Sequence, residues 1–289
     1  MRVLYPRAQQ TPGSDFSESC FVPDDSSWSS DRRRVAPHSS TAFRLHPRLW
    51  RDEIHVWQID LAMDAASRSL LRSHLSEDES ERAARFRFDH DRNRFITARG
   101  MLRTLLARYL QKQPRDLRFF LGREGKPALA LDSSERVLSF NVSHSQDVAV
   151  FAFGWNRSIG VDVEKVRSDV EYDDIAQHYF SAGEMQSLAQ LPRRKRVEGF
   201  FLCWTRKEAY VKASGGGLQI PLDSFDVSLE PGNSARFLGG VHSSWRISSF
   251  MVGNEYPAAL VYDGPPVDLR FFILGRDTHC LPSAPAAQI

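Results

Sequence analysis

The sequence predicts an α+β fold with two similar lobes, each a small antiparallel sheet packed with helices. Segments in which apolar residues alternate, as in strands, stand apart from segments in which they recur at helical intervals. The order strand, helices, strands occurs twice along the chain, and the second round begins near residue 157. Separate runs of strands and helices are typical of α+β folds, and their repetition predicts two lobes.

The first lobe is predicted to begin with a strand in residues 52–61, DEIHVWQIDL, where apolar residues alternate. Ser76 and Glu79 have the spacing of a capping box, which marks the start of a helix. A longer helix is expected in residues 94–110, where apolar residues lie at helical intervals. Further strands are expected in residues 117–121, 137–145 and 147–154.

The second lobe is predicted to begin with the strand SIGVDVEKV, residues 158–166. Ser181 and Glu184 repeat the capping-box spacing. A long helix in residues 197–218 is expected to stop at the glycine run that starts at Gly215. The other helices and strands are expected in residues 173–180, 181–191, 225–230, 245–252 and 258–264.

Composition divides the chain into four segments. Residues 1–46 are rich in Ser, Pro, Asp and Arg and show no periodicity, so a disordered N-terminal extension is expected. Residues 47–157 are predicted to form the N-terminal lobe, and residues 158–264 the C-terminal lobe. Residues 265–289 are expected to be a C-terminal tail, which contains the apolar stretch LRFFIL.

Charge and cysteine content exclude several classes of protein. The net charge of +2 predicts no overall attraction to nucleic acid. The three cysteines lie far apart, so neither a disulfide framework nor a zinc site is expected. No apolar run has the length of a membrane span, and residues 1–16 lack the apolar core of a signal peptide. A cytoplasmic protein without a membrane segment is therefore expected.

The strand SIGVDVEKV carries two carboxylates where an apolar strand is expected. Asp162 and Glu164 are two positions apart, which places them on one face of a strand at about 7 Å. Neighbouring carboxylates repel each other and resist burial, so a cation is expected beside them. Val161 and Val163 are expected to face the other way, into the core.

A second acidic position lies in the long helix, in the stretch WTRKEAYVK. Glu208 and Lys212 are four residues apart and share a helix face. They are either a surface ion pair or part of a partly buried site, and the aromatic residues around them favour the site. If the helix packs on the strand, Asp162, Glu164 and Glu208 can hold Mg²⁺ or Mn²⁺, and Lys212 can neutralise a phosphate. A structural cluster of ion pairs remains the alternative.

Other residues suit phosphate binding, although each could equally be solvated or structural. Lys126 lies in a glycine turn before Pro127, and Ser143 and His144 end a predicted strand. No phosphate loop, dinucleotide-binding turn or nucleophile elbow is present, so the nucleophile is expected on a second substrate. The arginines with this potential are Arg82, Arg85, Arg94, Arg99 and Arg103.

Taken in order, the motifs GKP, FNVSHS, IGVDVE and WTRKEAYVKASGGGL strongly resemble the surfactin-synthetase (Sfp) type of 4′-phosphopantetheinyl transferase. The resemblance covers roughly residues 53–262. It implies two lobes related by pseudo-twofold symmetry, in a monomer that binds coenzyme A between them. It also implies Mg²⁺-dependent transfer of phosphopantetheine to a serine of an acyl or peptidyl carrier protein, with release of adenosine 3′,5′-bisphosphate.

The resemblance implies a role for each of the residues singled out. Glu208 would accept the serine proton and, with Asp162 and Glu164, hold Mg²⁺. The coenzyme A contacts would come from Lys212 and Lys207 at the pyrophosphate, Ser143 and His144 at phosphates, Lys126 and Pro127 at the adenine, and Arg82 and Arg94 at the 3′-phosphate.

Two alternatives belong to other classes of function. A Mg²⁺-dependent phosphohydrolase or nuclease could use the same acids, but the sequence shows nothing specific for an activated water. A degenerate family member could bind coenzyme A or a carrier protein without catalysis. The presence of Asp162, Glu164, Glu208 and Lys212 argues against such decay.

Overall fold

The computed structural model describes residues 48–122, 126–130, 137–167 and 170–275. The predicted N-terminal extension, residues 1–46, lies outside the described residues, as does the end of the predicted tail, residues 276–289.

The first half packs three helices against a sheet. Strand β5 lies between β1 and β4 and is antiparallel to both. The long helix α3 and helix α1 cover one face of this sheet and form a core with it. The elements are β1 (Glu53–Asp60), α1 (Ala65–Ser73), α2 (Glu77–Ala84), α3 (Asp89–Leu110), β2 (Phe119–Leu121), β3 (Pro127–Leu129), β4 (Leu138–Ser145) and β5 (Val148–Trp155).

The second half repeats this plan. Strand β10 lies between β6 and β9 and is antiparallel to both, and α6 packs on β6 and β10. Its elements are β6 (Ile159–Val163), α4 (Tyr172–Tyr179), α5 (Ala182–Gln190), α6 (Arg193–Ser214), β7 (Asp226–Val227), β8 (Phe237–Gly239), β9 (Trp245–Val252) and β10 (Tyr256–Asp263). Short helical turns within the described residues are Pro114–Asp116, Gly217–Gln219 and Leu222–Ser224.

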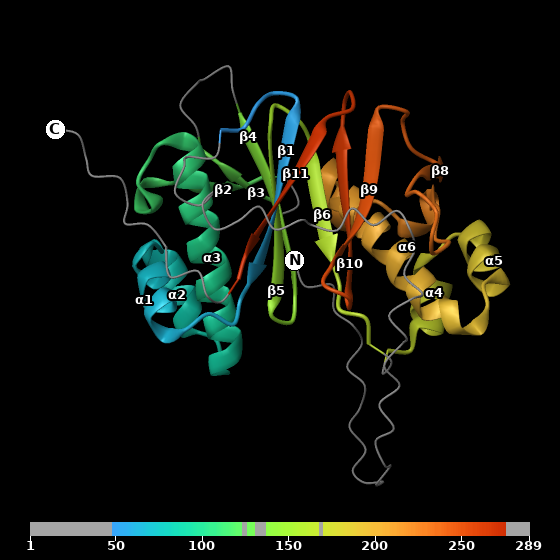
Figure 1. Cartoon of the computed structure of the whole chain (residues 1–289), viewed down its shortest axis with the longest axis horizontal. Coiled ribbons are helices and arrows are strands. Elements are labelled where there is room, and N and C mark those ends of the chain that lie inside the picture. Colours follow the sequence, from blue (N-terminus) through green and yellow to red (C-terminus); the bar gives the residue numbers. More distant parts are fainter. Residues whose placement is uncertain (1–47, 123–125, 131–136, 168–169, 276–289) are drawn as a thin grey trace, which may run out of the picture.

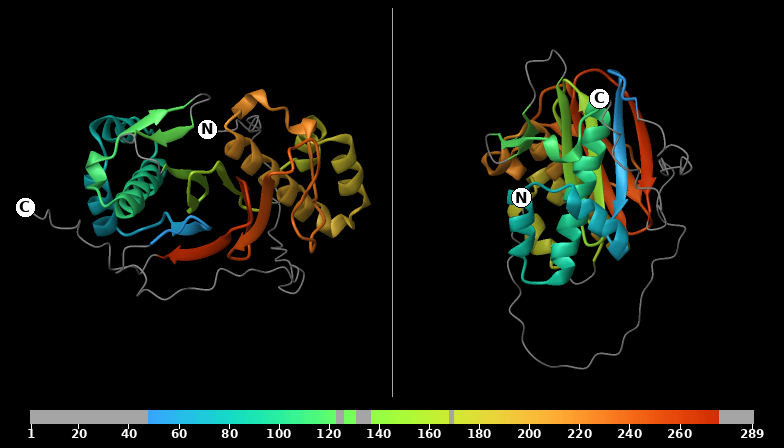
Figure 2. Two further views of the ribbon diagram at one scale, coloured as in Figure 1. Left: turned by 90° about the horizontal axis from the view of Figure 1, so that it is seen from above. Right: turned by 90° about the vertical axis from the view of Figure 1, so that its left-hand side faces the viewer.

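The two halves share one connectivity, which confirms the predicted α+β class with two similar lobes. The strand orders β1-β5-β4 and β6-β10-β9 both place the last strand between the first and the penultimate one. Figure 1 shows four layers: helices α1–α3, the first sheet, the second sheet, and helices α4–α6. Figure 2 shows the same two groups of helices at opposite ends of the molecule. Between the sheets lies a shared core that includes Val161 and Val163, as predicted.

Part of the predicted C-terminal tail is a strand of the first sheet. Strand β11 (Asp268–Leu274) runs parallel to β1, so this sheet is not purely antiparallel. Phe272 stacks on Trp57 with ring centroids 4.4 Å apart, and Phe271 packs edge-on against Phe250 of the second sheet. The apolar stretch is thus a strand because it fills both cores, which a solvated tail could not do.

The halves meet where the edge strands β4 and β6 lie side by side. Three side chains of β4 at alternate positions accept hydrogen bonds from backbone N–H groups of β6 and of Lys165, two residues beyond its end. The pairs are Asn141 Oδ1 with Val161 N at 2.9 Å, Ser143 Oγ with Val163 N at 3.4 Å, and Ser145 Oγ with Lys165 N at 3.0 Å. These bonds give partners to backbone N–H groups at a sheet edge. Such groups destabilise a protein when they are buried without a hydrogen-bond partner.

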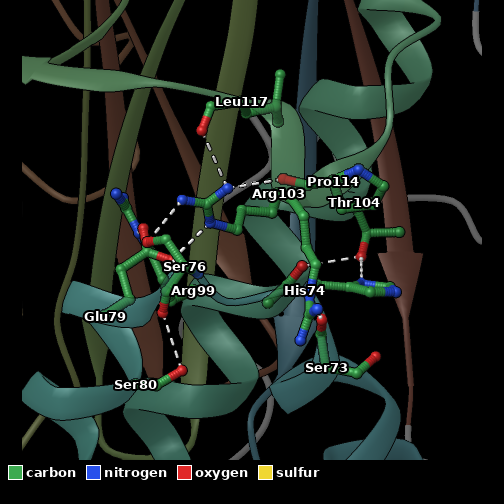
Figure 3. A network of polar contacts seen from close by, with 12 residues as sticks. Ser73, His74, Ser76, Glu79, Ser80, Arg99, Arg103, Thr104, Pro114 and Leu117 are labelled. Carbon is green, nitrogen blue, oxygen red and sulfur yellow. Dashed lines mark hydrogen bonds and ion pairs between the residues drawn. The ribbon is translucent and has the colours of Figure 1, made fainter.

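Two arginines of α3 without an assigned function hold the start of α2. The capping box of Ser76 and Glu79 forms as predicted. Arg103 is buried; its Nε lies 2.5 Å from Glu79 Oε2, and it also donates to the Pro114 and Leu117 carbonyls (Figure 3). Arg99 pairs with the other Glu79 oxygen. These side chains therefore stabilise the first half and are not directed at a ligand.

Because β11 packs in the core, we expect Leu274→Ala to destabilise the protein and Ile273→Ala to do so much less. Leu274 is buried, whereas Ile273 is exposed on the same strand. Leucine truncation in a core costs about 2–5 kcal/mol, which lowers the melting temperature of a chain this size by about 5–15 °C. Thermal unfolding followed by circular dichroism measures both variants. Equal and small shifts would show that β11 does not pack on β1.

Candidate active site

A cavity of about 790 Å³ lies between the two halves. Its walls come from β4 and Lys126–Pro127 of the first half, and from β6, α4, α6 and residues 215–223 of the second. The predicted site residues that line it are Lys126, Pro127, Ser143, His144, Asp162, Glu164, Glu208 and Lys212.

Gly160 allows β6 to approach α6 closely enough to build this site. A Cβ at residue 160 would lie 2.1 Å from the Ala209 carbonyl oxygen and 2.3 Å from the Ala213 nitrogen. Both atoms belong to the backbone of α6, which could not move without displacing Glu208 and Lys212. The glycine therefore sets the distance between the carboxylates of the strand and the charged face of the helix.

Asp162 is the centre of the polar contacts in the cavity. It is buried, and its Oδ1 accepts from Ser143 Oγ at 2.9 Å and from Lys212 Nζ at 2.5 Å. Lys212 Nζ also donates to Ser143 Oγ at 3.0 Å. Burial acts to lower the pKa of Lys212, but Asp162 and the other carboxylates outweigh it and raise that pKa. Lys212 therefore remains a cation at neutral pH.

The other two carboxylates line the same cavity and are short of positive charge. Burial, and next the charge of Asp162, raise the pKa of Glu164 to about 8. The same two causes, in the same order, raise the pKa of Glu208 to about 7. Lys212 pairs directly with Asp162, and a further cation beside Glu164 and Glu208 would relieve the repulsion among the three carboxyl groups.

The carboxylate oxygens of the cavity are ligands that suit a hard divalent cation, although they are not arranged as a complete coordination shell. Within the described residues, no three His, Cys, Asp or Glu side chains lie close enough together to hold a metal ion. The predicted convergence of three carboxylates on one ion is therefore not seen. Asp162 Oδ2 is buried and has no hydrogen-bond partner among the described residues. A free carboxylate oxygen suits Mg²⁺, which often uses one or two carboxylates and completes its shell with water and phosphate.

Lys126 joins the two halves beside the cavity. Its ammonium donates to the Lys212 carbonyl at 2.7 Å and to the Ile159 carbonyl at 2.9 Å. These contacts place a positive charge at the C-terminal end of α6, where the helix dipole is negative. Burial lowers the pKa of Lys126 to about 8. Pro127, at the cavity, is exposed.

Two of the predicted phosphate-binding arginines do not line the cavity. Arg82 is exposed on α2, and its guanidinium lies 5.2 Å from the centre of the Phe95 ring. Arg94 donates to Asp147 at 2.8 Å, in the turn between β4 and β5. His144, the next-to-last residue of β4, is exposed and lines the cavity. The histidine is therefore placed for a ligand in the cavity, and the two arginines lie outside it.

Lys207 was predicted to assist at the pyrophosphate, but it points away from the cavity. Its side chain is fully buried, and its ammonium lies 2.7 Å from Glu184 Oε2. It follows from helix geometry that Lys207 and Glu208, as consecutive residues, project about 100° apart. The sequence motif alone does not show which of the two faces the site.

Two family models match the chain, one to each half. The model described as the 4′-phosphopantetheinyl transferase superfamily matches residues 158–261. The model described as 4′-phosphopantetheinyl transferase, N-terminal, matches residues 64–155. The 4′-phosphopantetheinyl transferase HetI of Nostoc sp. is 38% identical over 216 residues, which cover 75% of this chain and 90% of HetI. The chain belongs to the 4′-phosphopantetheinyl transferase superfamily.

Other relatives agree with the two-domain Sfp type of this superfamily. The transferase Sfp of Bacillus subtilis is 31% identical over 189 residues, which cover 65% of this chain and 82% of Sfp. Among solved structures, the holo-[acyl-carrier-protein] synthase of Thermotoga maritima has 22% identity. It aligns with a TM-score of 0.30 over 37% of this chain and 62% of its own, too partial an overlap to bear on the fold.

The sequence did not point to two residues at the site of this phosphopantetheinyl transferase. Asn141 and Ser145 line the cavity on either side of Ser143. Ser145 donates to Glu164 Oε2 at 3.0 Å, as Ser143 does to Asp162. The sequence does contain a pattern that could have identified them. Both are polar residues of a predicted strand, and they lie two positions before and two positions after Ser143, on the same face.

The transferase also has no membrane-spanning helix in its described part. None of the helices there combines the length and the apolar character that crossing a lipid bilayer requires.

We expect Gly160→Ala to disrupt the active site by separating β6 from α6. The added methyl group would collide with backbone, so overpacking should cost about 3 kcal/mol or more. Transfer activity should fall together with the melting temperature. Gly275→Ala is the matched control, since nothing lies within 4 Å of a Cβ there. A Gly160→Ala variant as active and stable as the control would contradict this account.

Proposed function

We propose that this transferase moves the 4′-phosphopantetheine group of coenzyme A to a serine of an apo acyl or peptidyl carrier protein, in a Mg²⁺-dependent reaction that releases adenosine 3′,5′-bisphosphate. The observation that carries the proposal is the placement of Asp162, Glu208 and Lys212 around one cavity between the halves. No nucleophilic side chain of the enzyme is needed, because the attacking oxygen arrives on the carrier protein.

In the proposed reaction, the carrier serine oxygen attacks the β-phosphorus of coenzyme A. A bond forms between that oxygen and phosphorus, and the bond from the phosphorus to the bridging oxygen breaks. Adenosine 3′,5′-bisphosphate leaves with the bridging oxygen and the bonding electron pair. Glu208 accepts the serine proton, and Lys212 neutralises negative charge on the phosphates. Enzymes of phosphoryl transfer act mainly in this way, by positioning the reactants and stabilising charge.

Asp162 would hold Mg²⁺ through Oδ2, the oxygen without a partner among the described residues. Glu164 and Glu208 line the same cavity and would complete the acidic side of the site, Glu164 directly or through water. When bound, the ion would neutralise and polarise the pyrophosphate. Mn²⁺ could replace it, because it also prefers oxygen ligands.

Coenzyme A would occupy the cavity with its phosphates near β4. His144 would donate a hydrogen bond to a phosphate oxygen, and Pro127 would lie against the adenine. Ser143 would donate to a phosphate oxygen by redirecting the hydroxyl hydrogen that it gives to Asp162 in the unliganded site. The cavity volume of about 790 Å³ lies within the range of about 300–1,000 Å³ for ligand pockets.

A loading assay tests the proposed function. The enzyme is incubated with coenzyme A, Mg²⁺ and apo carrier proteins from fatty-acid, polyketide and peptide synthases, and the carriers are analysed by mass spectrometry. A mass gain of one phosphopantetheine, with adenosine 3′,5′-bisphosphate in equal amount, supports transfer. Release of inorganic phosphate with an unchanged carrier would support a phosphohydrolase, and neither product would support a protein that only binds coenzyme A.

The Glu208→Gln variant should keep its fold and lose most of its turnover. Loss of a positioned acid–base group typically costs about 10²–10⁴-fold in rate. The variant's kcat is compared with that of Glu81→Gln, a change at an exposed residue of α2, which does not line the cavity. Near-wild-type loading by the Glu208 variant would refute its role as the proton acceptor.

The Asp162→Ala variant tests the metal site. The wild-type enzyme should lose activity in excess chelator and recover it when Mg²⁺ is added back, whereas the variant should stay inactive at any Mg²⁺ concentration tested. Isothermal titration of Mg²⁺ in the presence of coenzyme A measures binding separately from turnover. Normal loading by the variant in excess chelator would rule out a catalytic metal at this residue.

A further inference from the structure

Lys207 is a buried cation that the mechanism above does not use. Its side chain is 0% exposed and forms a salt bridge of 2.7 Å with Glu184, which is itself buried. The same ammonium donates to the carbonyls of Leu222 and Phe225, both at 2.6 Å. It lies 4.3 Å from the centre of the Phe225 ring. All three of its hydrogen atoms therefore have acceptors, which fixes the geometry of the group.

The Glu184 carboxylate links Lys207 to two other parts of the second half. Its Oε2 accepts from Ser181 N at 2.9 Å, which completes the capping box at the start of α5. Its Oε1 accepts from Val227 N in β7 at 2.8 Å. The buried pair of Lys207 and Glu184 thus joins α6, α5 and the chain segment that runs from residue 220 to residue 227.

This segment is also a wall of the cavity. Residues 220–223 line the cavity, and Leu222 offers its carbonyl to Lys207. On the same helix, the next residue, Glu208, faces the cavity itself. One turn of α6 therefore places Glu208 in the site and, through Lys207, holds residues 220–223, which form a wall of that site.

We propose that Lys207 is a positioning residue, which holds residues 220–223 in the conformation that binds coenzyme A. The proposal rests on the proposed function, in which coenzyme A occupies this cavity. The competing interpretation is that the pair only stabilises the fold. The two differ in one measurable respect, because a purely structural pair would change the melting temperature without changing substrate binding at temperatures well below it.

The neighbouring Arg206 provides a matched control. It is also buried on α6, and it donates to Ser249 Oγ at 2.9 Å and Ser228 Oγ at 3.1 Å. Neither serine lines the cavity. An Arg206→Met variant therefore removes a buried cation of the same helix without releasing a cavity wall.

The experiment compares Lys207→Met with Arg206→Met at a temperature at which both are folded. We expect Lys207→Met to raise the KM for coenzyme A by about 10- to 100-fold, the usual loss when a supporting group is removed, with a smaller fall in kcat. Arg206→Met should lower the melting temperature and leave KM within about two-fold of wild type. An unchanged KM in Lys207→Met, or an equal rise in both variants, would overturn the proposal.

Two further variants keep the test decisive if Lys207→Met does not fold, since it leaves the buried Glu184 unpaired. The double variant Glu184→Gln, Lys207→Met removes both charges and should also show the raised KM. Lys207→Arg keeps the charge and should restore part of the affinity. The wild-type loading assay separates the two proposals: no transfer by wild type would refute the function, whereas normal transfer with an unchanged KM in the double variant would refute only the role of Lys207.

Discussion

The active site depends on the junction at which β4 and β6 meet through side chains instead of a backbone ladder. Asn141, Ser143 and Ser145 accept hydrogen bonds from alternate N–H groups along β6 and the residues that follow it. Buried N–H groups need partners, so these bonds determine how the first half sits against the second. The serine hydroxyls then donate to Asp162 and Glu164. The bonds that join the halves thereby orient the acidic groups of the site.

The electrostatics of the cavity follow from this geometry. Asp162 of β6, Glu164 just beyond it and Glu208 of α6 line one cavity, and Lys212 is placed at Asp162. Burial and, next, the charge of Asp162 raise the pKa of Glu164 and of Glu208. A divalent cation would offset the negative charge of these carboxylates and would at the same time attract an anionic pyrophosphate, which suits the binding of both in one complex.

Much of the fold could be predicted because local patterns agree with the tertiary structure. Both capping boxes form, and α6 ends at Gly215 in a left-handed conformation. Strand β11 was missed as a strand of the sheet because its partner β1 lies more than 200 residues earlier, and apolar alternation does not identify a partner. Long-range pairing of this kind leaves no local signal.

The sequence by itself determined the chemistry of the site: hard oxygen donors on a strand, and a Glu and a Lys one helical turn apart. Spacing within one element is sufficient for that, because strand and helix geometry set which side chains share a face. Only the tertiary structure decided which charged side chains line the cavity and which are buried elsewhere. Lys207 turned inward to Glu184, and Arg103 to Glu79, because a buried cation takes the acceptors that packing brings to it, wherever they lie in the chain.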